Sequence, residues 1–567
     1  MSIILRKVLF RFNCSQAPYF NLPQRILLKQ YQSPNSLSHQ PTFNQLRLHF
    51  RNNPFYMSKH FIVIASVVLF SQHLNAQSSA MLATRQFVKQ NAGSIINEYV
   101  RFLSIPNVVG DTVGIKKNTA FIMKMMRDRG IQNIQLLSGT TAATPPSIYG
   151  EVMVPGARQT LIFYAHYDGQ PVNPAQWAKG LAPFTPLLYT NAIDKGGTKI
   201  SYPTDGNFNN DWRIYGRSAS DDKAGVAVIL NAMDVIIKKE LKHSTNIKFF
   251  FEGEEEAGSP HLKEILQKYS SLLQSDAWII CDGPIHQSGK KQIVFGVRGD
   301  AHLDLTVYAS KRPLHSGHYG NWAPNPALML AKLLAGMKDD NGKVVIKGFY
   351  DDVTPLSPSE KLALANVPSV DEQMKNELGI SASETKGASL NEAINLPSLN
   401  INGMQSGNVG KQASNQIPTF ATAVLDLRLV LGNDWQRQQQ KVIDHIKARG
   451  YFVLDREPTN EQRATHEKII KVLLGNDGYN AQRTSLDLPL AKKIIEAVKT
   501  TTADQVVLQP TMGGSLPLFL FEKYLGAKTI TVPVANHDNN QHAENENIRL
   551  GNFFDGIETM VALMMIK

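Results

Sequence analysis

Short apolar runs in this chain end in side chains that can bind a metal ion or assist one. The runs cover residues 161–165, 247–251, 277–281 and 529–534, and each has the length and composition of a strand. The polar residues that follow them include His166, Glu255, Asp282 and His542. Open α/β sheets place their sites outside the carboxyl ends of the strands. We therefore predict that the four endings share one crevice.

The rest of the apolar pattern predicts helices within 81–135 and over 223–239 and 260–274. It also predicts paired strands over 148–166 and a long polar loop over 181–211. The pattern changes at residue 294: strand-like alternation follows at Leu303, Leu305 and Val307, and no metal-type ending occurs before residue 536. We predict an inserted domain at 297–457 with its own sheet and helices. The flanking segments 77–296 and 458–567 would form the catalytic domain.

Composition and charge narrow the class of protein. The 567 residues are 43% hydrophobic, which is ample for two or more domains, and the formal net charge is +11. Eight of the 59 basic residues and none of the 48 acidic ones lie at positions 1–60, which leaves 51 against 48 elsewhere. Because basic and acidic residues are nearly equal in number after residue 60, this part of the chain has no excess of positive charge that would attract a polyanion. We therefore expect no nucleic-acid binding. Cys281 is the one cysteine after residue 14, and we interpret it as a buried small hydrophobe.

The first 76 residues resemble a targeting region. Lys59 and His60 precede a largely apolar run of ten residues and then a short polar stretch, which is the layout of a signal peptide at 57–76. The apolar run is too short to span a bilayer, which needs about 20 residues. We therefore predict export, periplasmic or secreted, with residues 1–56 as a non-native or targeting extension. The alternative is that residues 1–56, which are basic and free of acidic residues, direct the chain to an organelle.

The polar endings have the chemistry of a metal site. His166 and Asp168 share one face of an extended segment, so Asp168 can orient the imidazole. Residues 252–256 include four glutamates directly after three phenylalanines. Crowding of like charges at the edge of a core is costly unless cations neutralise them. Carboxylates and imidazoles without a thiolate suit zinc, manganese or cobalt, and Asp221 is the natural residue to bridge two metal ions.

Six motifs containing these residues resemble a known family, the dinuclear-zinc exopeptidases and deacylases that include carnosinase, glutamate carboxypeptidase and acetylornithine deacetylase (metallopeptidase family twenty). The motifs are AHYDGQP at 165–171, YGRSASDDKAG at 215–225, EGEEEAGS at 252–259, LHSGHYG at 314–320, GGSLP at 513–517 and QHAENE at 541–546. They follow the family's order, and the resemblance covers residues 85–567. It departs from the family at Ser218, where a glycine is usual, and in the long loop 181–211.

The resemblance implies an α/β catalytic domain with a central mixed sheet flanked by helices, and an inserted α+β lid and dimerisation domain. It implies two divalent metal ions per subunit, most commonly zinc. The implied ligands are His166 and Asp282 for one ion, Glu256 and His542 for the other, and Asp221 as the bridge. Glu255 would be the general base, with Asp168 behind His166.

Three further residues have roles implied by the same resemblance. His315 would reach the active site of the partner subunit in a homodimer and polarise the substrate carbonyl. Arg428 would hold a substrate carboxylate, and Ser515 would lie near it.

The expected activity is hydrolysis of an amide bond in a dipeptide or short peptide, as in a dipeptidase or aminopeptidase. The resemblance favours this activity because peptidases of this kind carry aspartate at position 282, whereas deacylases and carboxypeptidases tend to carry glutamate. Deacylation of an N-acyl amino acid is the alternative. A non-catalytic peptide-binding dimer is a third hypothesis, which loss of metal ligands would indicate.

Overall fold

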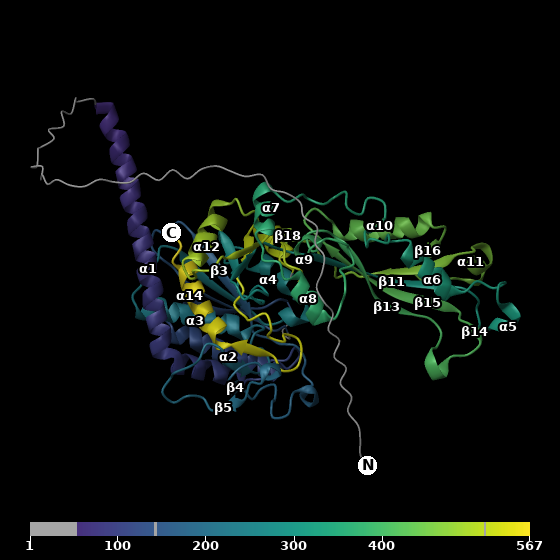
Figure 1. Ribbon diagram of the computed structural model, residues 1–567, viewed down its shortest axis with the longest axis horizontal. Coiled ribbons are helices and arrows are strands. Elements are labelled where there is room, and N and C mark those ends of the chain that lie inside the picture. Colours follow the sequence, from purple (N-terminus) through teal and green to yellow (C-terminus); the bar gives the residue numbers. More distant parts are fainter. Residues whose placement is uncertain (1–53, 141–143, 515–516) are drawn as a thin grey trace, which may run out of the picture. The chain divides into compact units, whose positions relative to one another are not determined.

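The computed structural model describes residues 54–140, 144–514 and 517–567, with side chains from residue 79 onward. Residues 68–567 form one compact unit (Figure 1). Its first helix, α1, runs over Pro54–Leu103, so the predicted signal peptide at 57–76 falls within a helix whose side chains there lie outside the described part. Among the described residues, no helix combines the length and apolarity that a membrane span requires.

An eight-stranded sheet is the centre of the fold, in the order β1-β2-β7-β3-β8-β20-β9-β19. The strands are β1 (Gln132–Leu137), β2 (Ser147–Val152), β7 (Asn246–Glu252), β3 (Thr160–His166), β8 (Ala277–Ile280), β20 (Lys528–Thr531), β9 (Gln292–Val294) and β19 (Val507–Gln509). The four predicted runs become β3, β7, β8 and β20, which are neighbours in the sheet and parallel. Their carboxyl ends therefore meet at one edge, as the sequence predicted.

Helices cover both faces of this sheet because its central strands are apolar on both sides. Phe163, Phe249 and Ile279 pack on one face in the core formed with α3 (Lys223–Lys238) and α14 (Leu550–Met564), which Figure 1 shows side by side. Tyr164 and Trp278 point to the other face, toward α4 and α13. The other helices of this part are α2 (Thr112–Asp128), α4 (Leu262–Lys268), α12 (Pro489–Lys499) and α13 (Phe519–Leu525).

A second sheet has five strands in the order β13-β15-β11-β17-β16. They are β13 (Ser398–Gln405), β15 (Phe420–Leu429), β11 (Gly299–Tyr308), β17 (Ile469–Leu474) and β16 (Phe452–Leu454). The predicted alternation at Leu303, Leu305 and Val307 is confirmed as the buried face of β11. Strand β17 continues the sheet beyond residue 457, so the predicted end of the inserted domain cuts through this sheet. The division into domains otherwise remains a prediction.

Helices α6 (Pro326–Ala335) and α10 (Trp435–Ala448) pack on the second sheet, in a core that contains Leu330, Val442 and Ile446. The shorter elements of this region are β12 (Leu314–His315), α5 (Ser316–Tyr319), α7 (Pro358–Ala365), α8 (Asp371–Leu378), α9 (Leu390–Ala393), β14 (Gln416–Ile417) and α11 (Asn460–Thr465). Two-residue strands β10 (Gly296–Val297) and β18 (Gln482–Arg483) pair near the start of the predicted insertion.

The prediction of a long polar loop over 181–211 is partly wrong. Within 181–211 the structure has β4 (Leu187–Tyr189) and β5 (Lys199–Ile200), which join β6 (Arg213–Tyr215) and β21 (Asn547–Arg549) in a four-stranded sheet. These strands are too short for an alternating pattern to show in the sequence. Their pairing matters for the site because β6 leads directly into the segment that contains Asp221, and β21 follows the segment that contains His542.

Candidate active site

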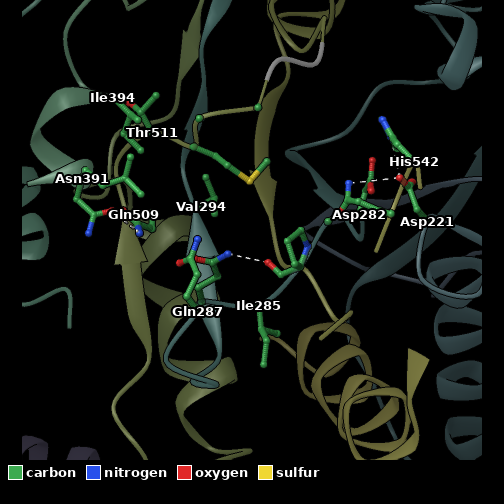
Figure 2. A pocket seen from close by; sticks show the side chains of 18 of the residues that line it. Asp221, Asp282, Ile285, Gln287, Val294, Asn391, Ile394, Gln509, Thr511 and His542 are labelled. Carbon is green, nitrogen blue, oxygen red and sulfur yellow. Dashed lines mark hydrogen bonds and ion pairs between the residues drawn. The ribbon is translucent and has the colours of Figure 1, made fainter. Parts of the chain in front are cut away.

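The predicted metal-binding residues lie together at the carboxyl edge of the main sheet. His166 is the last residue of β3, Asp282 follows β8, and Glu255 and Glu256 begin a short 3-10 helix (Glu255–Ala257) after β7. Asp221 precedes α3, whose N-cap is Asp222. Figure 2 shows Asp221, Asp282 and His542 at one end of a cavity.

Asp221 lies between the two histidines. One of its carboxylate oxygens, Oδ1, is 2.9 Å from Nε2 of His166, and the other, Oδ2, is 3.0 Å from Nε2 of His542. Asp282 completes one group with His166 and Asp221, and Glu256 completes a second with Asp221 and His542. The ligand atoms of each group lie within 4.8 Å of one another. One carboxylate thus belongs to two candidate metal sites at once.

Asp168 connects the imidazole of His166 to the glutamate pair. Its Oδ1 is 3.3 Å from Nδ1 of His166 and accepts a hydrogen bond from the backbone N–H of Glu255. Its other oxygen, Oδ2, accepts one from the N–H of Glu256 at 2.9 Å. Asp168 is completely buried. It therefore fixes the ring of His166 and the start of the glutamate turn with one side chain.

Burial makes full ionisation of this cluster unfavourable. It raises the pKa of Asp282 to about 6 and that of Glu256 to about 7, and it raises the pKa of Glu255 well above its usual value. Burial also opposes ionisation of Asp221, but the imidazoles of His166 and His542 outweigh it and hold the pKa of Asp221 below its usual value. Four carboxylates at this spacing need compensating positive charge. Their oxygen and nitrogen donors fit divalent cations.

Glu546 is an organising residue to which the sequence reasoning gave no role, although it lies in the QHAENE motif. Its side chain is fully buried and forms an ion pair with Arg217 at 2.8 Å. Its two oxygens also accept hydrogen bonds from the backbone N–H groups of Ser218, Ser220 and Asp221 and from the hydroxyl of Ser220. A carboxylate with this many donors holds the segment 217–221, and with it Asp221, in one position.

Two amide side chains contact the candidate ligands, and both lie in motifs that sequence reasoning had already singled out. Gln170 donates a hydrogen bond to Oε2 of Glu256 at 2.7 Å, and Gln541 donates one to Oδ2 of Asp221 at 3.3 Å. Ser218, which stands where a glycine is usual, has a φ of 61°. This left-handed conformation explains why glycine is favoured there.

The structure does not bring every predicted residue to this cluster. His315 lies on β12 with an exposed side chain, and its Nδ1 accepts a hydrogen bond from the N–H of Gly317. Arg428 lies on β15, where its Nε donates to Asp426 at 3.2 Å and its Nη1 is 3.8 Å from Asp300. Neither lines the cavity at the cluster. Ser515 is outside the described residues.

A cavity of about 460 Å³ opens beside the cluster. Asp221, Glu255, Asp282 and His542 line one end, and residues of β9, β19 and α9 line the other. Cys281 is buried behind Asp282, as expected for a small hydrophobe. The geometry therefore combines two adjoining groups of candidate metal ligands, a buried carboxyl group beside them and a cavity large enough for a small molecule.

Comparison with known proteins identifies the family. The model of peptidase family M20/M25/M40 matches residues 162–566. The chain belongs to this family. The predicted membership is therefore confirmed, and with it the hydrolase class and the requirement of this family for divalent metal ions.

Relatives in the family include dipeptidases. Human Beta-Ala-His dipeptidase is 24% identical over 437 residues, which cover 76% of this chain and 79% of the relative. Cys-Gly metallodipeptidase from Schizosaccharomyces pombe is 22% identical over 487 residues, which cover 83% and 95%.

Solved structures share the fold. A family M20 metallo-carboxypeptidase from Sulfolobus solfataricus has a TM-score of 0.66 at 26% identity, with 83% of this chain and 98% of that chain covered. The di-peptidase from Saccharomyces cerevisiae has a TM-score of 0.64 at 22% identity, with 86% and 98% covered. The predicted α/β fold, with a central mixed sheet flanked by helices and a second α+β region, is confirmed.

The prediction of an exported or organelle-targeted protein is wrong. The comparisons give no indication of a signal peptide, and the relatives found, among them the Cys-Gly metallodipeptidases of three yeasts, are mostly cytosolic enzymes. The apolar run at 61–70, which suggested the h-region of a signal peptide, is part of helix α1 in the structure. A largely apolar run of ten residues after a basic pair occurs both in signal peptides and in other helices, so the pattern did not discriminate between them.

Replacement of Glu546 should test its organising contacts. Glu546→Ala leaves the buried guanidinium of Arg217 without its carboxylate, and breaking a buried pair typically costs about 3–5 kcal/mol. We expect the free energy of unfolding, measured by urea denaturation, to fall by about that amount. Glu544→Ala is the matched control, because Glu544 is exposed and lies two residues earlier. Equal effects of the two substitutions would contradict the organising role.

Proposed function

We propose that the protein is a metal-dependent dipeptidase that hydrolyses the amide bond of dipeptides or short peptides. The observation that carries this proposal is the position of Asp221, whose two oxygens each face one histidine-carboxylate group. Family membership and the dipeptidase relatives support the same activity.

The proposed cofactor is a pair of divalent cations. His166 and Asp282 would hold one, Glu256 and His542 the other, and Asp221 both. Zinc suits this set of nitrogen and oxygen donors, and manganese and cobalt are the alternatives. Bound there, the cations would supply Lewis-acid activation of water and polarisation of the substrate carbonyl.

Glu255 is the proposed general base. Its Oε2 is 3.7 Å from Nε2 of His166, so its carboxylate borders the cation sites. Burial raises its pKa, which strengthens it as a base. It would take a proton from the attacking water and transfer it to the leaving amine. Asp168 would act indirectly, because it holds both the ring of His166 and the backbone of Glu255.

The activity can be tested by reconstitution of the metal-free protein with zinc, manganese or cobalt. We expect hydrolysis of a dipeptide with a free amine, no hydrolysis of N-acetyl amino acids, and no activity without metal. Product formation is followed by mass spectrometry in parallel reactions. Faster cleavage of the N-acetyl substrate would support the deacylase alternative instead, and metal uptake without either reaction would support a non-catalytic binding protein.

The role of Glu255 can be tested with Glu255→Gln, which keeps the shape of the side chain but cannot accept the proton. Loss of a general acid–base group typically costs about 10²–10⁴-fold in rate, so we expect turnover to fall at least ~100-fold. Metal content, measured by plasma emission spectrometry, should stay at the wild-type level. Loss of the metal from this variant would show instead that Glu255 is a ligand and that its role is exchanged with that of Glu256.

A homodimer with shared active sites is the proposed assembly, with 297–457 as lid and dimerisation domain. His315 is exposed and absent from the lining of the cavity. Both features are expected if its target is the active site of a partner subunit. There it would donate a hydrogen bond to the developing oxyanion. Arg428 is proposed to hold a substrate carboxylate, with Ser515 near it.

Mixing of two inactive variants tests this sharing. His315→Ala should lose about 10²–10³-fold in turnover, the usual cost of one oxyanion donor, and stay fully metallated. A heterodimer of His315→Ala with Glu255→Gln would have one site with both defects and one site with neither. We therefore expect activity to reappear on mixing. Heterodimers that form, as seen by native mass spectrometry, but remain inactive would contradict a shared site.

A further inference from the structure

The end of the cavity that lies away from the metal cluster has a distinctive lining. Figure 2 shows Asn391, Gln509 and Thr511 there, with Asp221, Asp282 and His542 at the opposite end. Gln292 and Gln287 also line this region. Among the described lining residues, the ionisable ones are Asp221, Glu255, Asp282 and His542, all at the metal end. The far end therefore has polar but uncharged side chains, with apolar side chains such as Val294 and Ile394 beside them.

This lining is built from the edge of the main sheet and one short helix of the insertion. Gln292 lies on β9 and Gln509 on β19, which pair in parallel. The side-chain amide of Gln509 donates a hydrogen bond to Oδ1 of Asn391 on α9 at 3.1 Å. The backbone carbonyl of Asn391 in turn accepts a hydrogen bond from the side chain of Asn395 at 2.8 Å. The amide pair of Gln509 and Asn391 thus joins the two parts of the chain at the end of the cavity.

Three of the polar side chains at this end are largely removed from solvent. Gln292, Gln509 and Thr511 are each more than nine-tenths buried. Gln292 donates a hydrogen bond to the carbonyl of Pro284 at 2.7 Å. The Oε1 atom of Gln509 is buried and, within the described part of the chain, accepts no hydrogen bond. Side-chain amides can both donate and accept, so they match an uncharged polar group on a ligand.

We propose that this end of the cavity, bounded by Gln292, Asn391, Gln509 and Thr511, is the subsite for one side chain of the substrate and selects uncharged, hydrogen-bonding side chains. The assignment presupposes the proposed dipeptidase activity. A charged side chain would lose its water there and find no counter-charge. Two divalent cations would balance the four carboxylates of the cluster, so the metal end would not compensate for that loss.

Dipeptide binding tests the subsite separately from catalysis. The zinc-loaded Glu255→Gln protein is titrated calorimetrically with Gln-Gly, Glu-Gly and Lys-Gly, and with Gly-Gln, Gly-Glu and Gly-Lys. In one of the two series we expect the glutamine dipeptide to bind at least about tenfold more tightly than both charged ones. Equal binding of a charged dipeptide in both series, or binding of none, would overturn the subsite.

Wild-type turnover of the same dipeptides is measured in parallel. Selective binding without hydrolysis by the wild type would refute the proposed activity but keep the subsite. Hydrolysis by the wild type without the expected selectivity in binding would keep the proposed activity but refute the subsite.

Two variants place a charge at the subsite. Asn391→Asp and Gln509→Glu should each raise the affinity for the lysine dipeptide relative to the glutamine dipeptide about tenfold, in the series that showed selectivity. Asn391 is only partly buried, so its variant avoids the folding risk at Gln509. Asn376→Asp on the exposed face of α8 is the matched control and should keep the wild-type ratio. Unchanged ratios in both subsite variants would overturn the assignment.

Discussion

Repulsion among buried carboxylates is the constraint on which the site depends. Asp221, Glu255, Glu256 and Asp282 converge where parallel strands end, and burial raises the pKa of three of them. A fold that relied only on its own contacts would avoid this arrangement. The surrounding structure therefore holds the carboxylates in place through Asp168 and Glu546, and leaves their charge to be balanced by cations.

The four strands and the cluster at their ends could be predicted because both follow from local pattern. Each apolar run of β3, β7 and β8 leads directly into its polar residue, and the parallel sheet brings these residues to one edge. The role of Glu546 could not be predicted in this way. Its contacts join it to residues more than 320 positions earlier, and a sequence pattern contains no distances between such segments.

Short elements show the same limit, because their positions depend on contacts that a sequence pattern does not contain. Strands β4 and β5 contain three and two residues, too few for alternation to distinguish them from loop. Helix α9 has four residues, and only packing places its Asn391 against Gln509 of the main sheet. The prediction of a targeting region was wrong for a different reason. A short, largely apolar run after two basic residues is not specific to signal peptides, so the local pattern alone could not identify one.

The pairing of β6 with β21 has a consequence for the order in which the protein is completed during synthesis. Asp221 follows β6, yet His542, Glu546 and β21 are translated more than 300 residues later. A nascent chain can form β3, β7 and β8 long before these residues leave the ribosome. Through that interval the exposed carboxylates would have neither Glu546 to position Asp221 nor His542 to share a cation. Competence to bind both metal ions would thus arise only after the segment 542–549 has left the ribosome.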